Sequence, residues 1–190
     1  MTFGGAGDAL AQQVKVPLTA VQAVVRTTAA AIVPPAPATP APAAVTVSPQ
    51  PLPLDSLVAL NSVDAALDEQ AKCLATAVYF ESMGEPLQGQ LAVANVVINR
   101  ARSGRYPSSW CGVVKQKAQF SFVRNGRFPR VDTDGEAWSR ARAIARIAAN
   151  NLAQALPADV LWYHADYVAP SWGKRLSRVD KIGAHIFYRA

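Results

Sequence analysis

With 190 residues, the chain is long enough for one ordinary domain and a tail. Its 51% hydrophobic and 17% charged residues are typical of a globular protein, although alanine inflates the first figure. The net charge of +6 and the pI of about 9.6 indicate an anionic partner, such as nucleic acid, acidic lipid or a carboxylate-rich bacterial wall. The sequence has no zinc-finger spacing, basic zipper or aromatic-basic RNA-binding signature, so we expect no nucleic acid partner.

Residues 1–33 are small and weakly apolar, and Lys15 and Arg26 are their only basic residues. No basic segment precedes a strong apolar stretch, so no signal peptide is evident and no stable membrane insertion is expected. The next twenty residues or so, up to Pro53, are rich in proline, alanine and threonine and cannot bury enough surface to fold. We therefore predict a disordered segment and Pro/Ala-rich linker over residues 1–55 and a folded domain over residues 56–190.

Residues 71–82 are apolar around almost the whole circumference of a helix, which predicts a buried helix. Asp68 is placed to cap its start. Gly84 and Pro86 end it, so we expect Glu81 in the last turn, at the lip of a cleft. Surroundings of low dielectric raise the pKa of a carboxyl group, which suits a general acid. The alternative is a glutamate at a helix end that simply reaches water.

Residues 89–100 predict a second buried helix, because their length and alanines outweigh their β-branched residues. Asn95 and Asn99 lie four residues apart on one face of it. They either brace the helix that carries Glu81 or form a polar stripe facing water. After this helix we predict a turn at 103–107 and a short helix at 110–114, capped by Ser108 or Ser109. Residues 119–122 are predicted to be a short strand or an extended loop, and residues 124–130 an exposed basic loop. A long helix is predicted from Asp132 or Thr133 to Leu152.

Two strand-like runs, residues 160–164 and 183–188, are separated by a loop with an aromatic turn at 170–173. They predict a small antiparallel hairpin. The fold class is therefore α+β and mostly α, a helical domain with a small antiparallel β element beside the cleft.

The two cysteines, Cys73 and Cys111, form no CxxC motif, and with His164 and His185 they make no recognisable metal site. From the residues alone, the pair is either a disulfide of an exported protein or two buried thiols of a cytosolic one.

Six blocks of the chain, in this order, resemble the SleB/CwlJ family of cell wall hydrolases, known from spore-cortex lysis. They are residues 77–85 (AVYFESMGE), 89–100 (GQLAVANVVINR), 111–114 (CGVV), 119–122 (QFSF), 163–165 (YHA) and 183–188 (GAHIFY). Together they are highly specific and cover nearly all of residues 71–189. The resemblance implies a lysozyme-like fold that is mainly α with a small β wing.

This family is similar to lytic transglycosylases, which cleave the β-1,4 bond between N-acetylmuramic acid and N-acetylglucosamine with a single glutamate. That glutamate protonates the glycosidic oxygen and then takes a proton from the muramic C6 hydroxyl, which closes a 1,6-anhydro ring. By the family pattern this acid/base is Glu81. A hydrolase that uses water in place of the C6 hydroxyl is the close variant, and a non-catalytic peptidoglycan-binding module of the same fold is the alternative.

The resemblance also implies substrate-binding positions near the cleft, namely Glu85, Gln119, Ser121, Tyr163 and His164. Tyr163 has two interpretations, stacking on a sugar face or orienting the leaving oxygen. For Glu85 we favour a structural role, a hydrogen bond to the cleft backbone or to a basic neighbour.

One departure from the family pattern concerns Met83, which stands where the family more often has an arginine. It puts the role of the neighbouring Glu85 in doubt more than that of Glu81. Outside the site, His185 is interpreted as a satisfied core histidine, and Trp162 and Trp172 as core aromatic residues.

The expected partner is the peptidoglycan glycan strand, cleaved by a monomer in the periplasm or another extracytoplasmic compartment. No cofactor and no metal are implied, and the sequence defines no accessory protein. Cys73 and Cys111 match positions associated with exported members of the family, so the resemblance implies a disulfide between them.

Overall fold

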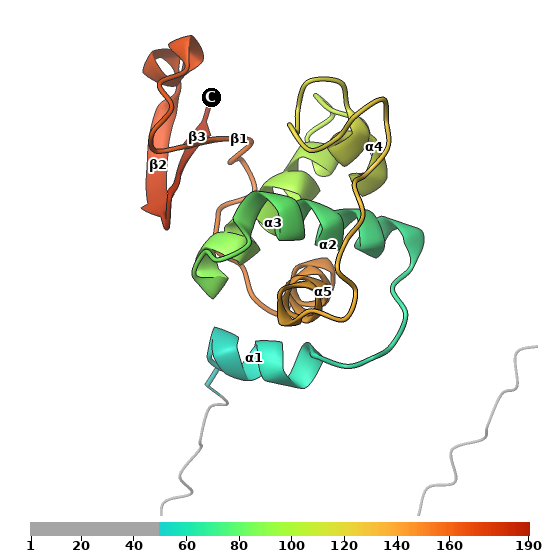
Figure 1. Ribbon diagram of the computed structural model, residues 1–190. Helices are drawn as coiled ribbons and strands as arrows, with labels where there is room; N and C mark the ends of the chain where they lie inside the picture. Colours follow the sequence, from blue (N-terminus) through green and yellow to red (C-terminus); the bar gives the residue numbers. More distant parts are fainter. Residues whose placement is uncertain (1–49) are drawn as a thin grey trace, which may run out of the picture. The chain divides into compact units, whose positions relative to one another are not determined.

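Five α-helices, one 3₁₀ helix and a three-stranded sheet form the part of the chain that the computed structural model describes, residues 50–190 (Figure 1). In chain order they are α1 (Leu54–Asn61), α2 (Glu69–Ser82), α3 (Leu87–Arg102), α4 (Trp110–Lys115), α5 (Glu136–Ala149), β1 (Trp162–Ala165), η1 (Ser171–Arg175), β2 (Ser177–Ile182) and β3 (His185–Arg189). The predicted class, α+β and mostly α, is confirmed. The disorder expected for the tail falls almost entirely on residues 1–49, outside the described residues. None of the helices within residues 50–190 has the length and hydropathy needed to cross a membrane.

Helix α2 packs against three other helices, α3, α4 and α5. Asp68 caps it as predicted, since its Oδ1 accepts the backbone N–H of Ala71 at 2.7 Å. Leu74 and Val78 are fully buried, and burial of each such side chain stabilises the fold by roughly 1.5–3 kcal/mol. The helix ends at Ser82, so Glu81 lies in its last turn, as predicted. A residue there is held firmly because the turns before it belong to the core.

Helix α3 is almost entirely buried, and its two asparagines neither brace α2 nor face water. Asn95 Oδ1 accepts the backbone N–H groups of Ala155 and Leu156, at 2.8 and 3.3 Å. Asn99 Nδ2 donates to the carbonyl oxygen of Val160 at 3.1 Å. Both amides therefore face the segment before β1 instead of α2 or water. They fix the start of β1 against α3, because buried backbone groups in a loop need such partners.

Helix α5 is shorter at both ends than predicted. Asp132 makes a local side-chain turn instead of capping the helix, and the first helical residue is Glu136. At the other end Asn151 adopts a left-handed conformation, with φ of 54°, so the helix stops at Ala149 and does not reach Leu152.

Helix α1 was not predicted, because it is short and follows directly on a proline-rich segment. It packs on α5, with Leu57 and Val58 against the core. Two arginines of α5 hold the connection from α1 to α2, since Arg142 donates to the carbonyl oxygen of Ala65 at 2.7 Å and Arg146 to that of Asn61 at 3.1 Å.

The sheet has the strand order β1-β3-β2, and all its pairs are antiparallel. Pairing of β1 with β3 was predicted, but β2 was missed, so the true hairpin is β2–β3. The reason is that β2 is mostly exposed and offers only Val179 and Ile182 as apolar residues.

Trp162 and Trp172 are partly exposed, so the prediction that they belong to the core is wrong. They lie on the sheet surface, where Trp172 contacts His164 and Tyr188 edge-on.

Cys73 of α2 and Cys111 of α4 form a disulfide, with their Cα atoms 5.1 Å apart. The pairing implied by the family resemblance is therefore present. It links the start of the Glu81 helix to the short helix that precedes the basic loop.

Candidate active site

A cavity of about 300 Å³ opens beside the end of α2. Its lining comes from four places in the chain: the last turn of α2, the end of α3, the loop after α4, and the sheet with the loop that follows β1. The lining residues are Phe80, Glu81, Arg100, Gln119, Ser121, Tyr163, His164, Ala165, Tyr167 and His185. Glu81 is the only Asp or Glu among them, so any acid chemistry in this cavity belongs to Glu81.

The Glu81 carboxyl is held by one hydrogen bond, which the Tyr163 hydroxyl donates to Oε2 at 3.0 Å. Burial raises the pKa of Glu81 above its ordinary value, because the carboxylate loses water on entering the cleft wall. The Tyr163 bond and the positive charge of Arg100 lower the pKa, but burial outweighs them. With Oε2 occupied by Tyr163, the other carboxyl oxygen is available to carry the proton toward a ligand.

Packing around the Tyr163 ring fixes the hydroxyl that holds this carboxyl in position. Its ring packs edge-on against His185, with centroids 5.2 Å apart, and obliquely against Phe187 at 5.7 Å. Burial, followed by the negative charge of Glu81, raises the pKa of the Tyr163 hydroxyl well above its ordinary value, so it stays a donor. The bond to Glu81 is a third role, beyond sugar stacking and orientation of the leaving oxygen.

Arg100 is a buried cation beside the carboxyl, and only 6% of it is exposed. Its Nε donates to the carbonyl oxygen of Leu161 at 2.7 Å, and its guanidinium lies over the rings of Tyr106 and Tyr163. No carboxylate within residues 50–190 forms an ion pair with it. An unpaired buried charge is costly. Arg100 therefore acts on the cavity, where it favours the ionised form of Glu81.

Glu85 does not line the cavity. Its two carboxylate oxygens accept the backbone N–H of Ala184, at 3.2 and 3.0 Å, in the turn between β2 and β3. Gly183 in that turn has φ of 58°, and a Cβ there would lie 1.6 Å from Glu85 Oε2. The contact is the structural one favoured for Glu85. It attaches the hairpin to the loop directly after Glu81.

His185 is buried, but the prediction that its ring nitrogens find hydrogen-bond partners is wrong for Nδ1. Its Nδ1 has no hydrogen-bond partner within the described residues and lies 3.9 Å from Glu85 Oε1. Burial lowers the pKa of His185, although the nearby carboxylates of Glu85 and Asp166 oppose this. A neutral imidazole therefore forms one wall of the cavity, in edge contact with Tyr163.

The remaining predicted residues divide into two groups. Gln119 and Ser121 line the cavity from an exposed loop, where sugar hydroxyls can reach them. His164 borders the cavity, but its ring contacts Ala165 O at 2.8 Å through Nδ1 and Tyr188 Oη at 2.9 Å through Nε2. Its ring thus belongs to the aromatic cluster with Trp172.

Five lining residues were missed: Phe80, Arg100, Ala165, Tyr167 and His185. Arg100 had a usable signal, because it follows directly on a run of apolar helical residues and an arginine is seldom buried without a partner or a function.

No group of three His, Cys, Asp or Glu side chains within residues 50–190 is placed to hold a metal ion. The arrangement at Glu81 combines one carboxyl, one hydroxyl and one guanidinium, a set that can carry out acid/base chemistry.

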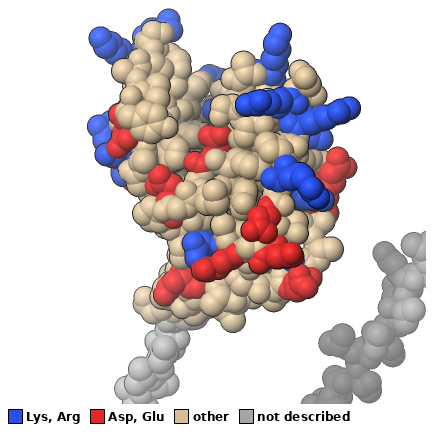
Figure 2. Space-filling view, in the orientation of Figure 1, with Lys and Arg blue, Asp and Glu red and all other residues tan. Residues whose placement is uncertain are grey.

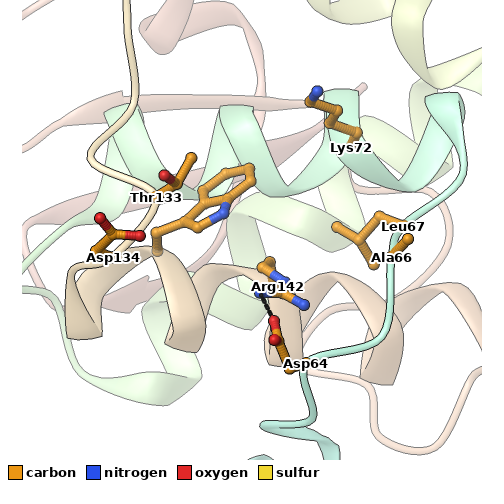
Figure 3. A pocket seen from close by; sticks show the side chains of 8 residues that line it. Asp64, Ala66, Leu67, Lys72, Thr133, Asp134 and Arg142 are labelled. Atoms are coloured by element: carbon orange, nitrogen blue, oxygen red, sulfur yellow. Dashed lines mark hydrogen bonds and ion pairs between the residues drawn. The ribbon is translucent and has the colours of Figure 1, made fainter.

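A larger cavity, of about 460 Å³, lies toward the other end of α2, between the α1–α2 connection and α5 (Figure 3). Arg142 and Asp64 point toward one another there, with Nη1 and Oδ1 3.2 Å apart. Its two acidic residues, Asp64 and Asp134, are exposed, whereas a general acid needs a carboxyl taken out of water. This cavity therefore offers no buried carboxyl, unlike the cavity at Glu81.

Residues 84–188, more than half of the chain, match the family described as Cell Wall Hydrolase. The chain belongs to this family, as its sequence blocks indicated. Glu81 lies just before the matched range, so its assignment depends on the geometry above.

Among curated proteins, the chain is similar to the spore cortex-lytic enzyme of Bacillus subtilis (strain 168), with 31% identity over 135 residues, or 68% of this chain and 41% of that protein. The spore cortex-lytic enzyme of Bacillus cereus is 33% identical over 114 residues, 60% of this chain and 42% of that protein. The chain spans about two fifths of the length of these relatives.

Among solved structures, the catalytic domain of the germination-specific lytic transglycosylase SleB from Bacillus anthracis matches with a TM-score of 0.54 and 30% identity, over 67% of this chain and 99% of that domain. The catalytic domain of the Bacillus cereus SleB protein matches with a TM-score of 0.50 and 30% identity, over 68% of this chain and 96% of that domain. The chain therefore carries the fold of a SleB catalytic domain.

Proposed function

We propose that this protein cleaves the glycan strands of peptidoglycan as a lytic transglycosylase, with Glu81 as its single acid/base. The observation that carries the proposal is a carboxyl with a raised pKa, alone among acids in its cavity and held by Tyr163. Membership of the cell wall hydrolase family and the fold of a SleB catalytic domain support the substrate class.

The reaction begins with Glu81 protonated, which its raised pKa favours. Its proton passes to the oxygen that joins N-acetylmuramic acid to N-acetylglucosamine. The bond from that oxygen to the muramic C1 breaks, and the bonding electrons leave with the oxygen. Glu81 is then a carboxylate, which the Tyr163 hydroxyl and the charge of Arg100 stabilise.

In the second half, the Glu81 carboxylate takes the proton of the muramic C6 hydroxyl. The C6 oxygen bonds to C1 and closes a 1,6-anhydro ring, so no water is consumed and Glu81 is protonated again. A second protein carboxylate, as in the usual glycosidase pair, is not needed because the nucleophile belongs to the substrate. The absence of another acid from the lining, within the described residues, agrees with this route.

The substrate lies outside the cytoplasmic membrane, and we propose an extracytoplasmic site of action for a monomer. The Cys73–Cys111 disulfide supports that location, because disulfides persist in oxidising compartments. Gln119 and Ser121 are proposed to bind sugar hydroxyls or acetamides at the cavity rim.

Mass spectrometry of purified peptidoglycan, digested with the wild-type chain and with Glu81→Gln, tests the proposal. We expect 1,6-anhydro-muramic ends, one water lighter than reducing ends, and a loss of about 10²–10⁴-fold in their rate of formation with the variant. Reducing muramic ends would show that water attacks C1 in place of the C6 hydroxyl, so that the enzyme is a hydrolase. Sacculi that bind both proteins but stay uncut would favour a non-catalytic binding module.

A further inference from the structure

The loop after α4 encloses a cavity of about 480 Å³ that the acid/base site does not use. We call it the arginine cavity; it is lined by Phe122, Arg124, Arg127, Phe128 and Pro129. Two of these residues are cations and the others are apolar. Such a composition suits a ligand that carries a negative charge on an apolar stem.

The two arginines are held side by side by the backbone. Arg124 and Arg127 exchange both N–H to O=C hydrogen bonds, at 3.1 and 3.0 Å, across a turn in which Asn125 and Gly126 have φ of 52° and 71°. Residues opposed in this way direct their side chains to the same face. Like charges in that arrangement repel one another. The tight turn therefore holds two arginines of like charge on one cavity at a cost, which a bound anion would offset.

Nothing in the described part of the chain neutralises this pair. No carboxylate of residues 50–190 forms an ion pair with Arg124 or Arg127. Between Glu85 and Asp132 the sequence contains eight lysines and arginines and no acidic residue. Figure 2 shows blue side chains at the upper right, where Figure 1 draws the loop after α4, and others at the upper left near the sheet, whereas many of the red ones lie lower down.

An aromatic wall joins the arginine cavity to the acid/base site. Phe122 stacks on Phe80 with ring centroids 4.9 Å apart, and it approaches Phe128 at 6.1 Å. Phe80 lines the Glu81 cavity and directly precedes Glu81. Ser121, the neighbour of Phe122, lines the same cavity. A branch of a ligand bound at Glu81 can thus follow the phenyl rings into the arginine cavity.

We propose that the arginine cavity binds a carboxylate on the peptide branch of the glycan strand cleaved at Glu81. Guanidinium groups bind carboxylates through two parallel hydrogen bonds, and the phenyl rings of Phe122 and Phe128 pack the aliphatic part of the peptide. The proposal rests on the proposed function, since it places the peptide by its attachment to that glycan. It makes peptide-bearing strands preferred over naked ones.

The test compares two glycans, sacculi with intact peptides and the same sacculi after the peptides are removed by an amidase. Binding is measured by co-sedimentation of proteins that carry Glu81→Gln, so that the glycan is not cut. Cleavage is measured with proteins that keep Glu81. The probe variant is Arg124→Gln/Arg127→Gln. The matched control is Arg175→Gln/Arg178→Gln, which removes the same charge from exposed positions of the sheet wing. Thermal unfolding checks that both variants fold.

We expect the probe variant to weaken binding to peptide-bearing sacculi by about tenfold, the scale of a lost charge-assisted hydrogen bond. Its KM on them rises by a similar factor with kcat unchanged, and its behaviour on stripped glycan equals that of the wild type. The control variant should match the wild type on both.

An equal loss of binding on both glycans would overturn the proposal, because the arginines would then contact sugar or act only through net charge. So would no loss on either. If the wild-type chain cuts neither glycan, the proposed function fails, while an arginine-dependent preference in co-sedimentation would still support the arginine cavity.

Discussion

The Tyr163 hydroxyl donates to Glu81 Oε2 at 3.0 Å, which joins β1 to the last turn of α2 across 82 positions of sequence. This bond opposes the effect of burial on the same carboxyl, since it lowers the Glu81 pKa that burial raises. The protonation of Glu81 is therefore set by a balance that one substitution can shift.

Tyr163→Phe removes the bond and leaves the ring in place. The Glu81 pKa should then rise further, because the contribution that lowers it is lost, so the protonated acid persists to higher pH. We expect the basic limb of the pH profile of kcat/KM to move upward. Its maximum should fall by about tenfold, because the nascent carboxylate loses a hydrogen bond. Tyr167→Phe, at an 86% exposed position on the same cavity, is the control and should change neither. A downward move of the basic limb would contradict the assignment.

Gly183→Ala tests the attachment of the hairpin to the loop after Glu81. A methyl group there would meet Glu85 Oε2 at 1.6 Å, so we expect destabilisation of about 3 kcal/mol or more. In a Glu85→Ala background that clash is absent, and what remains is the left-handed backbone strain of about 1–2 kcal/mol together with a tight contact of 3.3 Å to Pro86 Cδ. A double-mutant cycle by urea unfolding measures the difference. Additive costs would show that the Glu85 carboxylate does not occupy this space.

The Cys73–Cys111 disulfide closes a loop over a sequence separation of 38. Constraint of the unfolded chain over that length stabilises the fold by about 3–4 kcal/mol. We expect dithiothreitol to lower the melting temperature of the wild-type chain and to leave that of Cys73→Ala/Cys111→Ala unchanged. Equal melting of the oxidised and reduced wild-type chain would mean that the disulfide constrains nothing in the unfolded state.

The local features of the site were predictable from sequence. An apolar helix, a capping aspartate and a Gly-Pro stop are read from neighbouring residues, and they placed Glu81 correctly in the last turn of α2. The partners of Glu81 were not predictable in the same way. Arg100 lies in the last turn of α3, and only the packing of α3 on α2 brings its charge to the carboxyl.

The wrong predictions concern features that tertiary packing decides and neighbouring residues in the sequence do not reveal. Asn95 and Asn99 carry no mark of which neighbour they bind, and tertiary packing turned them to the segment before β1. Strand β2 lacks a buried face, so its alternation was too weak to see. His185 sits among apolar residues in the sequence, yet the turn that Glu85 holds places it at the cavity.

The raised pKa of Glu81 also predicts a cost in stability. Between the ordinary Glu pKa and its raised value, the folded chain keeps a proton that the unfolded chain has released. The free energy of unfolding therefore falls as pH rises through this window, and the loss is complete above the folded pKa. It amounts to about 1.4 kcal/mol for each unit by which the pKa is raised.

Glu81→Gln cannot ionise, so it escapes this cost while keeping an oxygen for the Tyr163 bond. We expect its free energy of unfolding, relative to the wild type, to grow as pH rises from about 4.5 and then to level off. His185, whose pKa burial lowers, is present in both proteins, and we expect its contribution to cancel in the difference. Urea unfolding of both proteins from pH 4 to pH 8 measures that difference. A difference that does not change with pH would mean that the folded chain does not hold the Glu81 proton above the ordinary Glu pKa, and the general-acid assignment would lose its basis.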